Sequence, residues 1–101
     1  MAVDAEVVVV GAGPVGLTLA IDLGQRGVRC VLLERKRASE FLPKMERCNA
    51  RTMEIYRRMG LAECIRQAGF RQHYPMDVFI VTSLDRPPIL RLPYPSVQDA
   101  R

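Results

Sequence analysis

The feature that most constrains the fold of this chain is a glycine-rich turn, with the sequence GAGPVG at residues 11–16. It follows a β-branched run, EVVVV at residues 6–10, whose continuous apolar character is typical of a strand buried on both faces of a parallel sheet. It leads into a segment in which Val15, Leu19 and Leu23 recur every four residues and predict one helical stripe. A strand, a tight turn and a helix in this order predict the first half of a βαβ unit.

The ends of this helix and the strand that follows it complete the pattern. Pro14 suits the first helical turn, where its missing N–H would be unpaired in any case. Gly27 lies where a left-handed C-terminal cap is expected. The run VRCVLL at residues 28–33 predicts a second buried strand, which ends at Glu34. Because two such strands with a helix between them form a right-handed crossover, the sequence predicts an α/β fold with a Rossmann-like dinucleotide-binding βαβ unit.

Two additional helices are predicted after a polar connection at residues 35–43. The first begins at residue 49 or 50 and ends at 58, and Met53, Tyr56 and Met59 share one of its faces. A stripe at this spacing is typical of side chains that pack in a core. The second helix is shorter and covers residues 62–68.

The last third of the chain predicts a C-terminal β-hairpin. Residues 77–83, DVFIVTS, have the composition of a strand, and residues 89–92 can pair with them across a turn at 85–88. Pro93 and Pro95 prevent a long central strand beyond that point.

Charge and cysteine content exclude several functions. The net charge of +4 comes from basic residues spread along the chain, with few aromatic residues between them, so no nucleic-acid partner is expected. No apolar run approaches the roughly 20 residues that span a bilayer, and Asp4 and Glu6 follow Met1 too closely for a secretory leader. We therefore expect a cytoplasmic protein with no membrane partner. The three cysteines are too widely spaced for a disulfide scaffold or a metal cluster.

The glycine positions predict how a dinucleotide is held. Gly11 allows the sharp turn out of the strand, Gly13 lets the backbone approach a pyrophosphate, and Gly16 lets the helix lie close to the strands. Pro14 and Val15 lie within this loop, at the positive end of the helix macrodipole, where free N–H groups bind phosphate oxygens. We expect the backbone of all five residues to form the cofactor site.

Glu34 lies 18 residues after Gly16, close to the spacing expected of a carboxylate that accepts hydrogen bonds from ribose hydroxyls. The alternative is a glycine turn in an ordinary α/β domain with Glu34 exposed to water. A carboxylate at this place also disfavours a 2′-phosphate on the ribose, although the neighbouring Arg35 favours one. The glycine pattern alone does not separate FAD from NAD.

Two stretches resemble a known family: VVVVGAGPVGLTLAIDLGQRGVRCVLLER and ERCNARTMEIYRRMGL. Together they are similar to the N-terminal part of the FAD-dependent aromatic hydroxylases, the single-component flavoprotein monooxygenases of the p-hydroxybenzoate hydroxylase and phenol hydroxylase type. The resemblance covers residues 5–69. It implies that FAD is the cofactor, that Arg35 lies near the adenosine half, and that Arg47 lies beside the pyrophosphate or the ribityl chain. For Arg51 it leaves open a flavin-side role, a backbone cap or exposure to water.

The resemblance also implies an activity for the complete enzyme. NAD(P)H would reduce the flavin, O₂ would be activated, and a small aromatic, phenolic substrate would be hydroxylated. No catalytic residue and no metal ligand is expected in this segment. Residues 1–69 would bind the ADP moiety, and residues 70–101 would begin an incomplete, strand-rich connection toward a substrate domain.

Some expectations concern the chain on its own. The 101 residues would be inactive alone and would need the remainder of a larger parallel-sheet FAD-binding domain, or a homo-oligomer, to complete the sheet. Two alternatives remain at this point: another type of FAD-dependent oxidoreductase, or a non-catalytic module that binds ADP-containing ligands or a protein partner.

Overall fold

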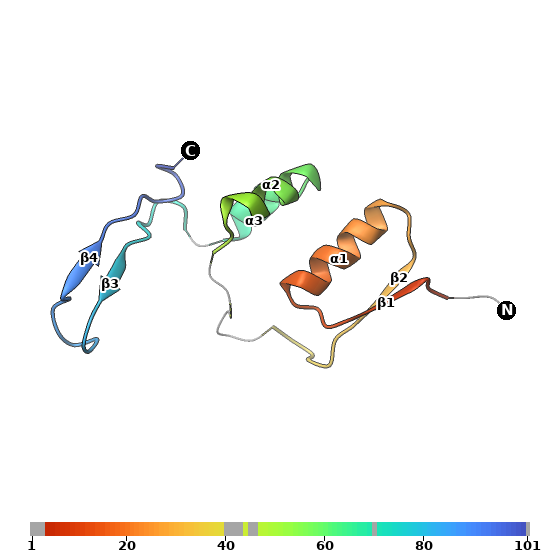
Figure 1. Ribbon diagram of the computed structural model, residues 1–101, viewed down its shortest axis with the longest axis horizontal. Helices are drawn as coiled ribbons and strands as arrows, with labels where there is room; N and C mark the ends of the chain where they lie inside the picture. Colours follow the sequence, from red (N-terminus) through yellow and green to blue (C-terminus); the bar gives the residue numbers. More distant parts are fainter. Residues whose placement is uncertain (1–3, 40–43, 45–46, 70, 101) are drawn as a thin grey trace. The chain divides into compact units, whose positions relative to one another are not determined.

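The computed structural model describes residues 4–39, 44, 47–69 and 71–100 (Figure 1). The elements in chain order are β1 (Val7–Val10), α1 (Pro14–Gln25), β2 (Cys30–Leu33), α2 (Ala50–Arg58), α3 (Ala62–Ala68), β3 (Val78–Ile80) and β4 (Leu90–Leu92). The chain divides into two compact units, Met1–Asn49 and Ala50–Arg101. The end of the predicted polar connection, residues 40–43, and Glu46 of the second family-like stretch lie outside the described residues.

The first unit is the predicted βαβ crossover. Strands β1 and β2 pair in parallel, with Val7 opposite Cys30 and Val10 opposite Leu33, and α1 lies against this pair (Figure 1). Strand β2 is two residues shorter than predicted, because the N–H of Val28 donates to the carbonyl of Leu23 at 2.9 Å and so belongs to the end of the helix.

Only one face of the β1–β2 pair is covered. The Val9 side chain is buried at 6% exposure, whereas Val8 and Val10 are 59% and 82% exposed. Val31 and Leu33 on β2 are exposed as well. The prediction that both faces are buried is therefore wrong for this chain. The physical reason is that α1 covers one face, and no other described helix or strand of the first unit lies on the opposite face.

The repeat of Val15, Leu19 and Leu23 lies on a helix as predicted, but this stripe is not the packed face of α1 in this chain. Val15 is 83% exposed and Leu19 46% exposed, so these side chains point away from the sheet and only Leu23 is half-buried. Gly16 faces the sheet instead: a Cβ at this position would lie 1.9 Å from the carbonyl oxygen of Gly11. The helix is too close to the strands for large side chains on that side, so small residues pack there.

The helix ends agree with the prediction. Gly13 is the N-cap of α1 and Pro14 is its first residue. After the last turn, Gly27 adopts φ 77°, the left-handed conformation expected of a glycine C-cap. No described helix is both long and apolar enough to cross a membrane.

Helices α2 and α3 belong to the second unit and contact each other. Met53 and Tyr56 on α2, and Met59 directly after it, are half-buried, which agrees with the predicted packing face. Gly60 allows the turn between the helices with φ 76°. The positions of both helices along the chain match the prediction.

Strands β3 and β4 form the predicted antiparallel hairpin, with Phe79 opposite Arg91. Both strands are shorter than predicted, at three residues each. The turn also comes earlier than the predicted 85–88, since the N–H of Arg86 donates to the carbonyl of Ser83 at 3.3 Å.

One carboxylate fixes the base of this hairpin. The Asp77 side chain is only 6% exposed. Its carboxylate accepts a hydrogen bond from the backbone N–H of Tyr94 at 3.0 Å and another from Nε of Arg91 at 2.8 Å. These contacts, with the Tyr94 amide the largest, hold the pKa of Asp77 below its ordinary value. No motif in the sequence predicted this cluster. The hairpin register could have suggested it, because Asp77 directly precedes β3 and Tyr94 follows β4.

Candidate functional site

The glycine loop begins with a turn that requires glycine. Gly11 follows β1 directly and adopts φ 103°, in the region that side-chain-bearing residues rarely occupy. Its N–H donates to the carbonyl of Leu33 at 2.7 Å, which extends the β1–β2 pairing by one hydrogen bond. The loop therefore leaves the sheet beside the carboxyl end of β2.

The start of α1 is open to a ligand. Gly13 has an ordinary extended backbone, with φ −75° and ψ −179°, and an added Cβ would meet no atom within 4 Å. The helix has no side-chain cap and no acidic residue in its first turn. The first intrahelical hydrogen bond is donated by Leu17 to the carbonyl of Gly13 at 2.9 Å. The N–H groups of Val15 and Gly16 precede that bond and point out of the helix start.

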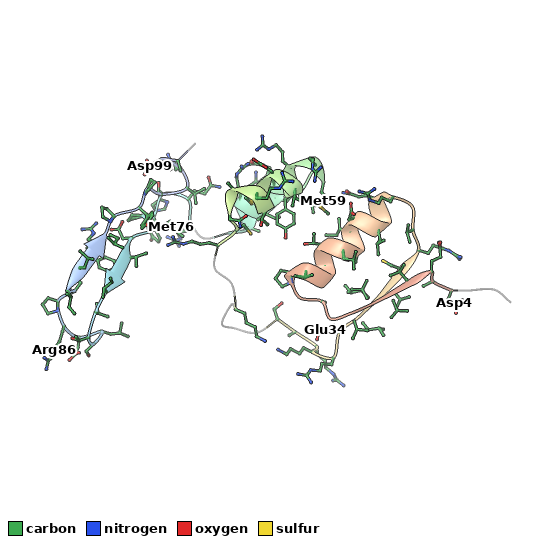
Figure 2. All side chains as sticks on the ribbon, viewed as in Figure 1. Asp4, Glu34, Met59, Met76, Arg86 and Asp99 are labelled. Atoms are coloured by element: carbon green, nitrogen blue, oxygen red, sulfur yellow. The ribbon has the colours of Figure 1, made fainter. Side chains whose placement is uncertain are left out.

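Glu34 lies beside this loop, at the end of β2 (Figure 2). One carboxylate oxygen, Oε2, accepts the N–H of Ala12 at 2.8 Å, and the other, Oε1, accepts the N–H of Lys36 at 2.9 Å. The Lys36 amide first, and then the Ala12 amide, hold the pKa of Glu34 below its ordinary value. Glu34 is therefore a carboxylate at neutral pH.

The contact from Glu34 to Ala12 was missed from the sequence, although a signal for it exists. Gly11 bonds to Leu33 across the strand pair, and the pairing of Val10 with Leu33 places Glu34 opposite Gly11, next to Ala12. A parallel register with the two strands ending together would have placed them side by side.

Of the two predicted arginines, Arg35 takes part in this group of contacts through its backbone amide, which also lowers the pKa of Glu34. Arg35 and Arg47 are both exposed, and their positions near the adenosine and the pyrophosphate stay predictions. Arg51 on α2 forms an exposed ion pair with Glu54, with Nη1 and Oε2 3.0 Å apart. Among its three possible roles, this contact fits the one on the water-facing helix surface.

No group of three or more His, Cys, Asp or Glu residues that could hold a metal ion occurs among residues 4–39, 44, 47–69 and 71–100. All three cysteines are free thiols.

A parallel βαβ unit with an open glycine loop at the helix start, and an acid at the end of the second strand, defines a dinucleotide-binding protein of the Rossmann type. More particularly, residues 4–99 match the model of the FAD binding domain family, and the chain belongs to that family. The predicted α/β fold class and the predicted cofactor, FAD, are thereby confirmed.

Individual relatives agree with the family match. The FAD-dependent monooxygenase apdD of Emericella nidulans is 44% identical over 78 residues, which cover 77% of this chain and 12% of the relative. A 3-(3-hydroxy-phenyl)propionate/3-hydroxycinnamic acid hydroxylase of Burkholderia vietnamiensis is 36% identical over 63 residues, 62% of this chain and 10% of the relative. The chain thus spans only about a tenth of the length of these curated relatives.

A solved structure extends the similarity to the fold. The rebeccamycin biosynthetic enzyme RebC with reduced flavin matches with a TM-score of 0.81 and 33% identity, over 93% of this chain and 18% of that one.

The residues of the loop fit the ADP half of FAD. Neither backbone strain nor a neighbouring atom in the described chain accounts for glycine at position 13. A missing Cβ at the start of a helix instead leaves room for a phosphate to reach the N–H groups.

Proposed function

We propose that this chain is the ADP-binding N-terminal portion of an NAD(P)H-dependent flavoprotein monooxygenase that hydroxylates a phenolic substrate. The observation that carries the proposal is the glycine loop, open at the start of α1 and joined to the second strand through Glu34. Support for the reaction comes from the relatives, one named an FAD-dependent monooxygenase and one a hydroxylase of hydroxyphenyl acids.

In this proposal the cofactor contacts come mostly from the backbone. Gly11 turns the chain, Gly13 leaves room for the pyrophosphate, and the N–H groups of Val15 and Gly16 bind its oxygens. Pro14 lacks an N–H but fixes the first helical turn. The positive end of the helix macrodipole stabilises the phosphate charge, by roughly 0.3–1 kcal/mol at an exposed site.

The charged residues have separate roles in the proposal. Glu34 accepts hydrogen bonds from the ribose hydroxyls, Arg35 lies near the adenosine half, and Arg47 binds the pyrophosphate or the ribityl chain. A guanidinium can bind two phosphate oxygens at once, which suits Arg47 to that role.

When bound, FAD supplies the redox chemistry, accepting a hydride from NAD(P)H and activating O₂. The residues of this chain bind and orient the cofactor. No catalytic side chain is assigned to this segment.

The proposal includes the setting of the domain. Residues 1–69 bind the ADP moiety, and residues 70–101 lead toward a substrate domain. The exposed face of the β1–β2 pair is completed by the rest of the protein or by a second copy, and neither a nucleic acid nor a membrane is a partner. The protein acts in the cytoplasm.

Absorbance spectroscopy tests the proposal. The full-length protein that carries this segment should be yellow when purified, and its flavin bands should bleach on addition of NADH or NADPH, faster when a phenol is present. A colourless protein that retains NAD would overturn the assignment of the site to FAD. A yellow protein whose bleaching no phenol accelerates, tested across simple and polycyclic phenols, would overturn the hydroxylase assignment.

A further inference from the structure

Two of the three residues that precede α1 in the glycine loop, Gly11 and Gly13, are glycines, so this part of the loop has considerable backbone freedom. The peptide between Gly11 and Gly13 is flanked by glycine on both sides. Such a segment loses conformational entropy when it is ordered around a ligand. The contacts that hold the loop before the ligand arrives therefore affect the binding free energy.

The structure describes two contacts that hold the N-terminal half of the loop. The first is the hydrogen bond from the Gly11 N–H to the carbonyl of Leu33, which continues the strand pairing. The second is the hydrogen bond from the Ala12 N–H to Oε2 of Glu34. The second contact is the one that a side chain makes, and it fixes the flexible peptide between the two glycines.

Glu34 is itself held in place. Its other oxygen, Oε1, accepts the N–H of Lys36 two residues further on, which fixes the carboxylate against its own backbone. The charges next to Glu34 in the chain are the cations Arg35 and Lys36, whereas the loop from Gly11 to Gly16 carries no titratable side chain. The carboxylate is thus ionised and oriented toward the loop.

We propose that Glu34 is a positioning residue for the glycine loop, holding the Ala12 amide in the binding conformation before the dinucleotide arrives. This role is separate from hydrogen bonding to the ribose, and its benefit for FAD binding rests on the proposed function. The Oε2 atom of Glu34, which accepts the hydrogen bond from the Ala12 N–H, has a second lone pair. A ribose hydroxyl can donate a hydrogen bond to this lone pair without breaking the contact with the loop.

Hydrogen exchange in the flavin-free protein tests this role directly. Glu34→Ala should accelerate exchange of the Ala12 amide by about tenfold, since the amide loses its acceptor. Glu34→Gln should have a smaller effect, because a side-chain amide still offers one oxygen as an acceptor. The affinity for FAD, followed by quenching of flavin fluorescence, should fall in the same order.

Glu6→Ala is the matched control. Oε1 of Glu6 accepts the N–H of Arg29 at 3.3 Å, so it joins the same two strands through the same kind of contact at their opposite end. This variant should leave both the exchange of Ala12 and the affinity for FAD unchanged.

A measurement on the unaltered protein avoids any dependence on variant folding. With ¹⁵N-labelled alanine and lysine, the amide proton shifts of Ala12 and Lys36 should follow one common titration as the pH is lowered through the pKa of Glu34. Independent shifts, or unchanged Ala12 exchange in Glu34→Ala, would overturn the positioning role even if FAD bound more weakly. Conversely, a protein that fails to bind FAD but shows the common titration would overturn the proposed function and leave the positioning role intact.

Discussion

Replacing Gly13 with aspartate should move stability and cofactor binding in opposite directions. Gly13 is the N-cap of α1, its backbone is extended as an N-cap requires, and no atom of the described residues lies within 4 Å of an added Cβ. No side chain caps this helix at present. Aspartate is among the preferred N-cap residues and exceeds glycine by a few tenths of a kcal/mol. Its charge adds roughly 0.3–1 kcal/mol through the helix macrodipole. The flavin-free protein should therefore become more stable by about 0.5–1 kcal/mol.

The same carboxylate should oppose FAD binding. Two unit charges 4 Å apart interact by about 1 kcal/mol in bulk water and about 4 kcal/mol near a protein surface. A pyrophosphate carries two negative charges, so even full water screening gives about 2 kcal/mol of repulsion. At 1.4 kcal/mol per tenfold, the dissociation constant for FAD should rise at least about 30-fold.

Gly24→Asp provides the matched control for this prediction. Gly24 lies in the last turn of α1, also with no atom within 4 Å of an added Cβ, and about 16 Å along the helix from Gly13. At this distance the charge is screened from the loop at physiological ionic strength. It should leave FAD affinity unchanged while lowering stability by roughly 0.3–1 kcal/mol, because a negative charge opposes the C-terminal end of the macrodipole.

Fluorescence titration with FAD and urea unfolding of the flavin-free protein measure the two effects. If Gly13→Asp bound FAD as tightly as the wild type, the pyrophosphate would not lie at the start of α1. If it lost both stability and affinity, the result would contradict the N-cap geometry on which the separation depends.

Three further predictions concern other residues. Gly16→Ala should lower the urea midpoint by an amount equivalent to about 1–3 kcal/mol, since its Cβ would lie 1.9 Å from a backbone oxygen; an unchanged midpoint would contradict the close packing of α1. The pKa of Asp77 is lowered in the folded state, so its contribution to stability is present above the unfolded pKa and is lost as the pH falls through the lower, folded value. In Asp77→Asn, the free energy of unfolding should therefore depend less on pH below about pH 4. A pH dependence identical to that of the wild type in this range would refute the prediction. Arg47→Ala should weaken FAD binding by roughly 10- to 100-fold if Arg47 contacts phosphate. Arg51→Ala, which removes the exposed ion pair with Glu54, should leave the affinity for FAD unchanged. Equal effects of the two variants would show that Arg47 is not part of the site.

The order and type of the elements could be predicted because their ends carry local chemical signals. Pro14 begins α1 and Gly27 ends it in a left-handed conformation, as both residue types do in other helices. The hairpin likewise agreed in pairing and differed only at its edges. These signals depend on a few neighbouring residues, so they can be recognised in a single sequence.

The direction in which α1 faces could not be predicted in the same way. Val15 and Leu19 form an apolar stripe, and such a stripe ordinarily marks the packed side of a helix. In the structure the packed side is set by the close approach at Gly16, and the apolar stripe faces outward. An apolar side chain is expected to be buried, but the sequence does not identify the helix, strand or partner that buries it.

The candidate site likewise has a part that could be predicted from the sequence and a part that could not. The positions of Gly11, Gly13, Gly16 and Glu34 around one loop followed from the spacing of a known binding pattern. The hydrogen bond from Ala12 to Glu34 did not, because it joins residues 22 positions apart and depends on strand register rather than on residue type.

The contact at Gly16 has a consequence for how this sequence can change through descent. The atom that any Cβ would meet is the main-chain oxygen of Gly11, and every residue has such an oxygen. Exchanging a side chain elsewhere does not remove that oxygen, so a larger residue at position 16 requires a shift of the main chain of the loop or the helix. How well position 16 tolerates a larger residue therefore depends on how far the main chain of the loop can move, and not on which side chains surround it.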